Sequence, residues 1–370
     1  MKKFFAMMTA LLLLVTCFTG CAGTPKASDP PPATPAPTEA QPEASAPASA
    51  DPGDWSSLKV AHLTERLGDN GFNDGCYAGV ERFTKEHGCE LTVVEVAELN
   101  DYSINARTFA QEGYDIVVIT TAAAVELITD VAAEFPETEF IITGGQNTGI
   151  KNLTSFEFAQ YENGFLAGAF CVLMNQELGH AAKSGFVSGV RSPAMERSQY
   201  GFTAGSEYVD GECIVVYVGD WTDVAKGKEI AMQMYQNDIR IVQAFAGGAG
   251  VGVYQAAESM GDGYYSMGSA DGQFHLSDTI LASMMQNNSD AFHELCRKAA
   301  AGELDGTAGV TILDLKSGVV RFGYNPLLED MVPQSIKDTI AELEAKIISG
   351  EIVPPQSEAE YNDFVANVLS

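Results

Sequence analysis

Basic residues are scarce in this chain. Lys and Arg number 21 against 50 Asp and Glu in 370 residues, which gives a formal net charge of −29 at pH 7. A surface of this sign repels phosphates and has few cations that would release counterions, so the composition excludes nucleic acid as a partner. The hydrophobic fraction of 46% suits a folded protein, and the length allows two lobes that each bury a core.

Motifs of the common catalytic sites are also missing. The chain contains no GxSxG, no HExxH and no CxxC, and its 5 His residues are scattered. Spacing alone assigns no pair of carboxylates as acid and base. The sequence therefore predicts a protein that is not an enzyme and that has no metal site and no cofactor.

A Gly-rich stretch at residues 247–252 does not form a phosphate-binding P-loop. It lacks the Lys-Ser/Thr pair of that motif and lies far from the first predicted strand. Its glycines are expected to let a ligand approach the backbone at the start of a helix. Phosphate binding is the less favoured alternative.

Cysteines are too few and too widely spaced for a disulfide framework or a zinc site. An odd number lies beyond the first 21 residues, although a single bridge stays open. We expect most of them to be small buried side chains. These cysteines are Cys76, Cys89, Cys171, Cys213 and Cys296.

A short apolar run at residues 4–18 follows Lys2 and Lys3 at the N-terminus. Ordinary transmembrane helices need about 20 apolar residues, so this run is too short to span a membrane. A charged start followed by such a core predicts a signal peptide over residues 1–20.

The signal peptide ends in a pattern that resembles a bacterial lipobox. Thr19 and Gly20 are small residues directly before Cys21, which predicts Cys21 as a lipidated N-terminus. An ordinary secretory signal with an incidental Cys is the alternative. Residues 21–56 are rich in Pro, Ala and Ser, so they predict a disordered stalk behind the lipid anchor.

Beyond the stalk, strand-like and helix-like segments alternate. This alternation predicts parallel sheets covered by helices on both faces, and two sheets fit the length better than one. The predicted strands lie at residues 58–63, 90–95, 116–119, 139–143, 184–187, 214–218, 241–245, 264–268 and 309–313. The predicted helices lie at residues 76–87, 102–112, 124–134, 164–175, 199–207, 225–236 and 253–260.

Residues that follow the predicted strands are candidate ligand contacts, because open α/β sheets bind ligands at the carboxyl ends of their strands. The first strand precedes GDNGFNDG at Gly68 to Gly75, a polar loop with one aromatic ring. Amides, carboxylates and isolated rings suit a planar or sugar-like polar ligand. The candidates from these loops are Asp69, Asn70, Phe72, Asn73, Thr121, Trp221, Gly247, Gly248, Gly250, Asp271 and Gln273.

Several of these segments together resemble the basic membrane protein family. Its members are bacterial lipoproteins that serve as substrate-binding components of ABC transporters, and some are purine nucleoside receptors. The resemblance extends over residues 58–355, and its order and spacing are more specific than any single motif. The segments that carry it are DNGFN at 69–73, YENGFLAG at 161–168, WTDVAKGKE at 221–229, AGGAGVGVYQAA at 246–257 and ISGEIVP at 348–354.

The resemblance implies an α/β, two-lobed periplasmic-binding-protein-like fold of type I. Parallel sheets flanked by helices would form each lobe, with three crossovers and a ligand cleft between the lobes. The crossovers are expected near Glu157, Met284 and Leu313. Residues 57–157 plus 285–313 would then form lobe 1, and residues 158–284 plus 314–370 would form lobe 2.

In this family the ring of Phe72 would be a platform for a nucleobase. A loop-anchoring Phe covered by neighbouring side chains is the alternative. A second ring would come from Trp221, Phe245 or Tyr254, and Trp221 could instead cap its own strand.

Two positions depart from the nucleoside-binding members of the family. Thr143 stands where those members tend to have Asp, and Gln286 is the candidate where they tend to have Lys. The acidic residue near Gly268 is shifted, which leaves Asp271 and Gln273 as candidates. These departures put the nucleoside, rather than the transport role, in question.

Together these features predict a monomeric, extracytoplasmic protein held on the membrane by a lipid. It would deliver a purine nucleoside or a similar heteroaromatic compound to an ABC permease. A sugar or another metabolite is the alternative ligand. A surface sensor and an enzyme are the alternative classes.

Overall fold

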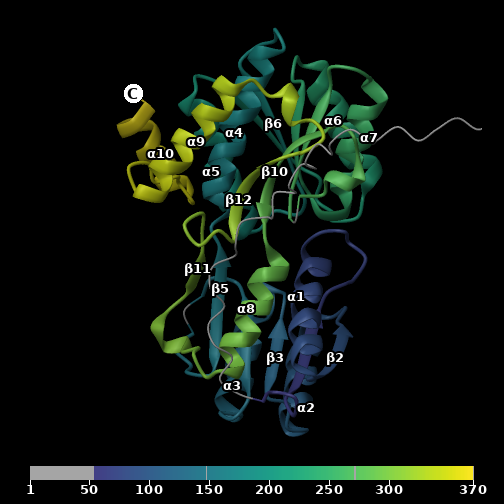
Figure 1. Cartoon of the computed structure of the whole chain (residues 1–370), viewed down its shortest axis with the longest axis vertical. Helices are drawn as coiled ribbons and strands as arrows, with labels where there is room; N and C mark the ends of the chain where they lie inside the picture. Colours follow the sequence, from purple (N-terminus) through teal and green to yellow (C-terminus); the bar gives the residue numbers. More distant parts are fainter. Residues whose placement is uncertain (1–53, 147, 271, 370) are drawn as a thin grey trace, which may run out of the picture. The chain divides into compact units, whose positions relative to one another are not determined.

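The computed structural model describes residues 54–146, 148–270 and 272–369 (Figure 1). By their contacts these residues belong to one compact unit. The predicted signal peptide, Cys21 and nearly all of the predicted stalk lie outside the described residues, as does Asp271. The last residues of the predicted stalk are described, and they differ from the expectation of disorder because Trp55 is buried against Phe83.

The first sheet contains six strands in the order β11-β5-β4-β3-β1-β2, and every neighbouring pair is parallel. Successive residues of its strands face two different hydrophobic cores. Val60 and Val118 face one cluster, while Ala61 and Val117 face the other. Strands that are apolar on both faces are typical of a parallel sheet covered on both sides. The strands are β1 (Lys59–Thr64), β2 (Glu90–Glu95), β3 (Ile116–Ile119), β4 (Glu139–Thr143), β5 (Leu153–Phe158) and β11 (Thr311–Leu313).

The second sheet also contains six strands, in the order β12-β10-β9-β8-β6-β7. All its pairs are parallel except β10 with β12, which is antiparallel. The strands are β6 (Lys183–Ser188), β7 (Glu212–Tyr217), β8 (Ile241–Phe245), β9 (Tyr265–Gly268), β10 (Ile280–Gln286) and β12 (Val320–Tyr324).

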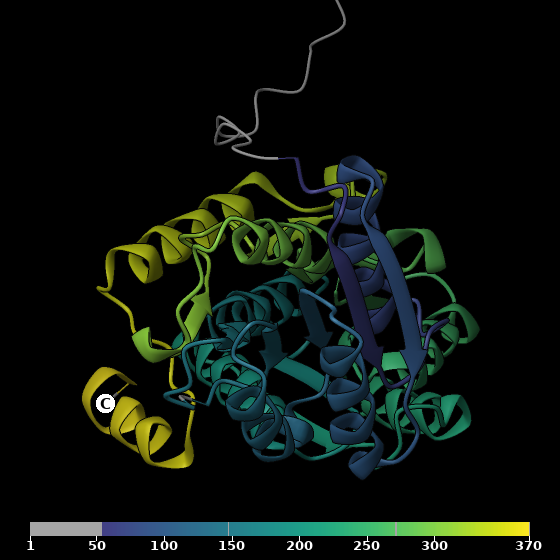
Figure 2. The same ribbon diagram turned by 90° about the horizontal axis from the view of Figure 1, so that it is seen from below.

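Helices cover both sheets, and we call each sheet with its helices a lobe. In the first lobe, α1 and α8 lie side by side on one face, and α2 and α3 pack on the other (Figures 1 and 2). The helices are α1 (Phe72–His87), α2 (Leu99–Gln111), α3 (Val125–Glu134), α4 (Gln160–Glu177), α5 (Pro193–Tyr208), α6 (Val224–Gln236), α7 (Val251–Met260), α8 (Asn288–Ala300), α9 (Gln334–Ser349) and α10 (Glu358–Phe364).

The chain passes between the two sheets three times. It leaves the first sheet after β5, returns after β10, and leaves again after β11. This connectivity confirms the predicted two-lobed α/β fold with three crossovers. The residue limits assigned to each lobe from the sequence stay a prediction.

Glycines bring α4 and α5 of the second lobe into close contact. A Cβ at Gly168 would overlap the carbonyl oxygen of Phe202, and a Cβ at Gly205 would overlap that of Phe165. Without these side chains the two backbones touch directly, which packs the helix that follows the first crossover firmly onto its lobe. Because α4 directly follows the first crossover, this contact also sets the position at which the chain enters the second lobe.

Two chemical features of the described residues bear on the earlier expectations. The cysteines in this part of the chain form no disulfide with one another. Among residues 54–369 with their two gaps, no helix is both long enough and apolar enough to cross a membrane.

Candidate ligand-binding site

Two carboxylates hold the loop between β1 and α1 in one shape. Asp69 accepts hydrogen bonds from backbone N–H groups at 2.9, 3.0 and 3.2 Å, and Asp74 accepts two more at 2.7 Å. A carboxylate at this end of a helix meets N–H groups that have no partner within the helix, and it suits the positive end of the helix dipole. The donors are Gly71, Asn73 and Asp74 to Asp69, and Gly68 and Asn70 to Asp74.

The two amides of the loop have different surroundings. Asn73 uses both ends of its side chain, because its Oδ1 accepts from the Thr64 hydroxyl at 2.9 Å and its Nδ2 donates to Asp69 at 3.0 Å. Asn70 is exposed and has a positive φ of 49°. Asn73 therefore fixes the loop to β1, whereas the Asn70 side chain faces solvent.

Phe72 is half-buried at the first position of α1. Its ring meets Phe158 and Phe292 edge to face, with centroids 6.3 and 6.4 Å apart. Such contacts fix the orientation of a ring while leaving part of it exposed. The structure therefore combines both expectations for Phe72, since neighbouring rings anchor it and a part of its surface stays open.

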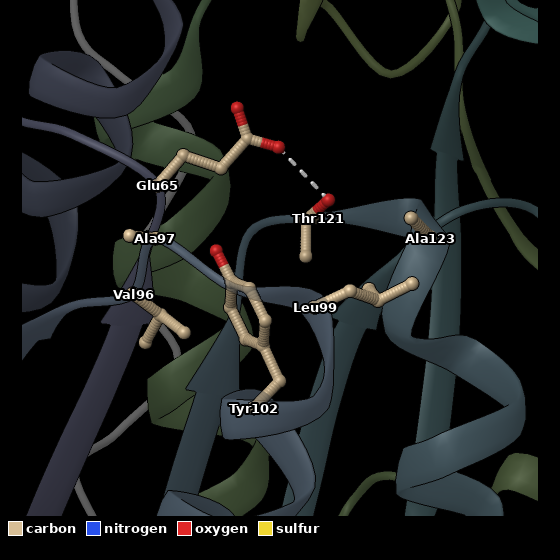
Figure 3. Close-up of a pocket in the computed structure, with 7 residues that line it drawn as sticks. All are labelled: Glu65, Val96, Ala97, Leu99, Tyr102, Thr121 and Ala123. Carbon is tan, nitrogen blue, oxygen red and sulfur yellow. Dashed lines mark hydrogen bonds between the residues drawn. The ribbon is translucent and has the colours of Figure 1, made fainter.

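Thr121 borders a cavity of about 290 Å³ at the carboxyl ends of β1, β2 and β3 (Figure 3). Its hydroxyl donates to the Glu65 carboxylate at 3.0 Å. Tyr102 points its hydroxyl toward the same space, and burial raises the pKa of Tyr102 above its usual value. Glu65 was not among the sequence candidates, although it directly follows the first strand and the strand-end rule also selects it.

Trp221 lies at the corresponding edge of the second sheet. A Cβ at Gly189, the residue after β6, would overlap its ring, so the missing side chain lets the ring lie on the backbone. Its carbonyl accepts from the Ala249 N–H at 2.8 Å. The predicted Gly247, Gly248 and Gly250 all belong to the single-turn helix that follows β8, so the structure brings these glycines and Trp221 together.

Of the three candidate second rings, Trp221 is the exposed one. Its relative exposure is 38%, compared with 8% for Phe245 and 2% for Tyr254. Phe245 packs against Phe186 in the core, with ring centroids 5.7 Å apart. Tyr254 is also buried, and its hydroxyl donates to Gln273 at 2.7 Å.

Gln286 lies at the second crossover, as the last residue of β10. Its Nε2 donates to Asn288 at 2.6 Å, and its Oε1 accepts a hydrogen bond from Gln160. The side chain therefore joins the end of β10 to the starts of α4 and α8. Thr143, the other departure from the nucleoside-binding pattern, ends β4.

A charged pair that the sequence did not predict joins the lobes. Arg197 on α5 lies 3.1 Å from Glu157 on β5, and both side chains are largely buried. Burial raises the pKa of Glu157, although the Arg197 charge acts in the opposite direction. The residues lie 40 positions apart and share no motif, so only the folded chain reveals the pair.

The described residues contain no group of three or more His, Cys, Asp or Glu side chains that could hold a metal ion. Their strand-end loops instead present partly exposed rings, amides and small residues. These groups bind and orient a ligand by stacking and hydrogen bonding.

Comparisons with known proteins agree with this architecture. Two α/β lobes joined by three crossovers define a periplasmic-binding-protein-like fold of type I. The chain belongs to the Bmp family, described as ABC transporter substrate-binding protein PnrA-like, whose model matches residues 60–358. It is therefore a substrate-binding protein of an ABC transporter.

Curated relatives carry the names of the same family. The ABC transporter nucleoside-binding protein BmpA of Lactococcus lactis is 28% identical over 324 residues, which cover 81% of this chain and 90% of that protein. Basic membrane protein A of Borreliella burgdorferi is 25% identical over 307 residues, which cover 81% and 88%.

Solved structures share the fold. A solute-binding protein of an ABC transporter system from Aeropyrum pernix has a TM-score of 0.72 at 24% identity, covering 84% of this chain and 96% of that one. Its counterpart from Conexibacter woesei has a TM-score of 0.66 at 22% identity, covering 81% and 99%.

Proposed function

We propose that this substrate-binding protein captures a purine nucleoside, or a similar heteroaromatic compound, between its lobes and delivers it to an ABC permease. The observation that carries the ligand class is Phe72. Its ring is fixed by two other rings, partly exposed, and placed at the carboxyl edge of the first sheet. An aromatic face of this kind stacks on flat bases.

Trp221 is proposed as the second ring, since it is the exposed aromatic candidate of the second lobe. Asp69, Asn73 and Gln286 are proposed to shape the site rather than to contact the base, because their polar atoms already bond to the chain. Glu65 is added as a carboxylate that can accept from ligand hydroxyls.

The name of the Lactococcus lactis relative, a nucleoside-binding protein, supports the same ligand class. The neutral Thr143 and Gln286 imply that this chain holds its ligand without a charged side chain at those two positions. A ligand of altered sugar or base would fit such a change.

Mass spectrometry of compounds released from protein purified without added substrate tests the ligand. We expect a purine nucleoside or a related heteroaromatic compound, and we expect calorimetry to show tighter binding of adenosine or guanosine than of ribose or glucose. Release of a sugar, with no nucleoside binding in calorimetry, would contradict the proposal.

A lipid anchor at Cys21 is proposed to hold the protein on the outer side of the cell membrane, with the residues between Cys21 and Asp54 as a stalk and the protein as a monomer. The stalk is proposed to end before Trp55, because that side chain is buried in the core. Acyl chains gain about 0.8 kcal/mol for each buried methylene, so a multiply acylated Cys keeps a protein on the bilayer. We therefore expect Cys21→Ser to move the protein from the membrane fraction to the soluble fraction. Cys17→Ser is the matched control. Equal membrane retention of Cys21→Ser and the wild type would refute the anchor.

A further inference from the structure

Gln273 joins the two lobes by a hydrogen bond that involves no residue of the crossovers. The residue lies in the loop after β9 of the second lobe, and its Nε2 donates to the backbone carbonyl of Asn70 in the first lobe at 2.8 Å. Both the donor and the acceptor belong to the chain, so the bond does not need a ligand.

The second lobe fixes the orientation of the Gln273 amide. Its Oε1 accepts from the Tyr254 hydroxyl at 2.7 Å, and from the N–H and the hydroxyl of Ser269 at 3.1 and 3.2 Å. These donors hold the oxygen inside the lobe, so the NH₂ group points outward to Asn70.

The first lobe also holds the acceptor, the Asn70 carbonyl, in a fixed position. Asn70 lies between Asp69 and Gly71 in the loop that the two carboxylates hold, and its own N–H donates to Asp74 at 2.7 Å. The same loop leads into Phe72, the first residue of α1. A shift of the Asn70 carbonyl would therefore also move the loop that positions the Phe72 ring.

Backbone strain gathers at this junction. Among the described residues, five that are not glycine have a positive φ, and three of them meet here: Asn70 (49°), Ala270 (50°) and Gln273 (57°). The Ala270 carbonyl accepts from the Gln286 N–H at 2.8 Å, which ties the loop to the second crossover. Side chains rarely adopt this backbone region, and such strain gathers where the conformation serves a function.

We propose that Gln273 is a positioning residue that couples the Phe72 loop to the second lobe and thereby sets how far the lobes open. It does so through the Asn70 carbonyl, and it does not contact the ligand. A neutral hydrogen bond of this kind changes an equilibrium by about two- to tenfold. Only the ligand-release part of the test below rests on the proposed nucleoside function.

Gln273→Glu is the decisive variant, measured at a pH where the carboxylate is ionised. The carboxylate can still accept from Tyr254 and Ser269, but it has no hydrogen to donate to Asn70. Gln273→Ala also removes that donor, but it leaves the buried Tyr254 hydroxyl without its acceptor and should lower the melting temperature. Gln255→Glu, at an exposed position on α7, is the matched control for the added charge.

Single-molecule energy transfer in the full chain measures the opening, with one dye on exposed Glu112 of the first lobe and one on exposed Glu177 of the second. Without added ligand, we expect Gln273→Glu to shift the ratio of open to closed molecules by about two- to tenfold toward open. Because residue 273 is buried, the added charge should also lower the melting temperature, so the ratio is measured at a temperature where the variant stays folded. Gln255→Glu should keep the wild-type ratio. A wild-type ratio in folded Gln273→Glu would overturn the proposal.

Stopped-flow release of adenosine provides the second measurement. We expect Gln273→Glu to release adenosine about two- to tenfold faster than the wild type, because the closed state holds the ligand and has become rarer. If the lobes open in Gln273→Glu but adenosine binds to neither protein, the positioning role stands and the proposed ligand is wrong. If adenosine binds and its release rate is unchanged, the positioning role is wrong.

Discussion

Phe72→Ala is expected to weaken purine nucleoside binding by about ten- to a hundredfold. Stacking of a base on an aromatic ring is worth about 1–3 kcal/mol by alanine substitution, and each 1.4 kcal/mol is a factor of ten in affinity. Calorimetry with adenosine on the wild type and the variant measures the change. An affinity within about twofold of the wild type would contradict stacking on Phe72.

The same substitution also tests the anchoring role of the ring. Edge-to-face contacts are worth about 0.5–1.5 kcal/mol each, so loss of the contacts to Phe158 and Phe292 should lower the stability of the ligand-free protein moderately. Phe72→Leu keeps an apolar side chain in this position but removes the flat face. We expect Phe72→Leu to recover much of the stability and little of the affinity.

Phe135→Ala is the matched control for Phe72→Ala. Phe135 is half-buried at the end of α3, before β4, and so lies at the opposite edge of the first sheet. Its truncation should cost stability and leave adenosine affinity unchanged. Loss of affinity in Phe135→Ala would mean that binding follows stability in general rather than the Phe72 face.

The sequence predicts most strands of the two sheets because their apolar runs are bounded by polar loops. The runs at 90–95, 116–119 and 139–143 agree with β2, β3 and β4 to the residue. The segments that became β5, β10 and β12 were not predicted as strands. The sequence of β5 is LTSFEF, in which a buried Thr and Ser interrupt the apolar run that would indicate a strand. The strand β12 forms by antiparallel pairing with β10, which lies far away in the chain.

The sequence likewise predicts some residues of the candidate site and misses others. The strand-end rule finds the Phe72 loop, Trp221 and Thr121, because those positions are fixed by local order along the chain. The family resemblance offered Phe245 and Tyr254 as second rings, and it does not separate exposed from buried side chains, so both were candidates although the core covers them. Contacts between lobes, such as Gln273 with Asn70, depend on the crossovers and have no local signal.

His62 is expected to make the stability of the protein depend strongly on pH. It lies in the middle of β1 and is fully buried beside the Tyr77 ring, and neither ring nitrogen has a hydrogen-bond partner among the described residues. Burial lowers the pKa of His62 to about 4 from an ordinary value of 6.5. The folded protein therefore keeps this imidazole neutral at pH values where the unfolded chain protonates it.

The sign of the effect follows from this difference. Above about pH 6.5, His62 is neutral in both the folded and the unfolded state, so its contribution to the pH dependence of the free energy of unfolding vanishes. As the pH falls, His62 binds a proton in the unfolded chain but stays neutral in the folded protein. The free energy of unfolding therefore drops by about 2–3 kcal/mol by about pH 4.5. Glu139 acts in the opposite direction, because burial raises the pKa of its carboxyl to about 7 and makes the folded state the better proton acceptor.

His62→Phe separates the two effects, since the ring still stacks on Tyr77 but cannot take a proton. We expect urea unfolding to show that His62→Phe gains about 2–3 kcal/mol over the wild type between about pH 8 and about pH 4.5. His275→Phe, at an exposed position, is the matched control and should keep the wild-type profile. A constant difference between His62→Phe and the wild type across this range would show that the buried imidazole takes up its proton as easily in the folded protein as in the unfolded chain.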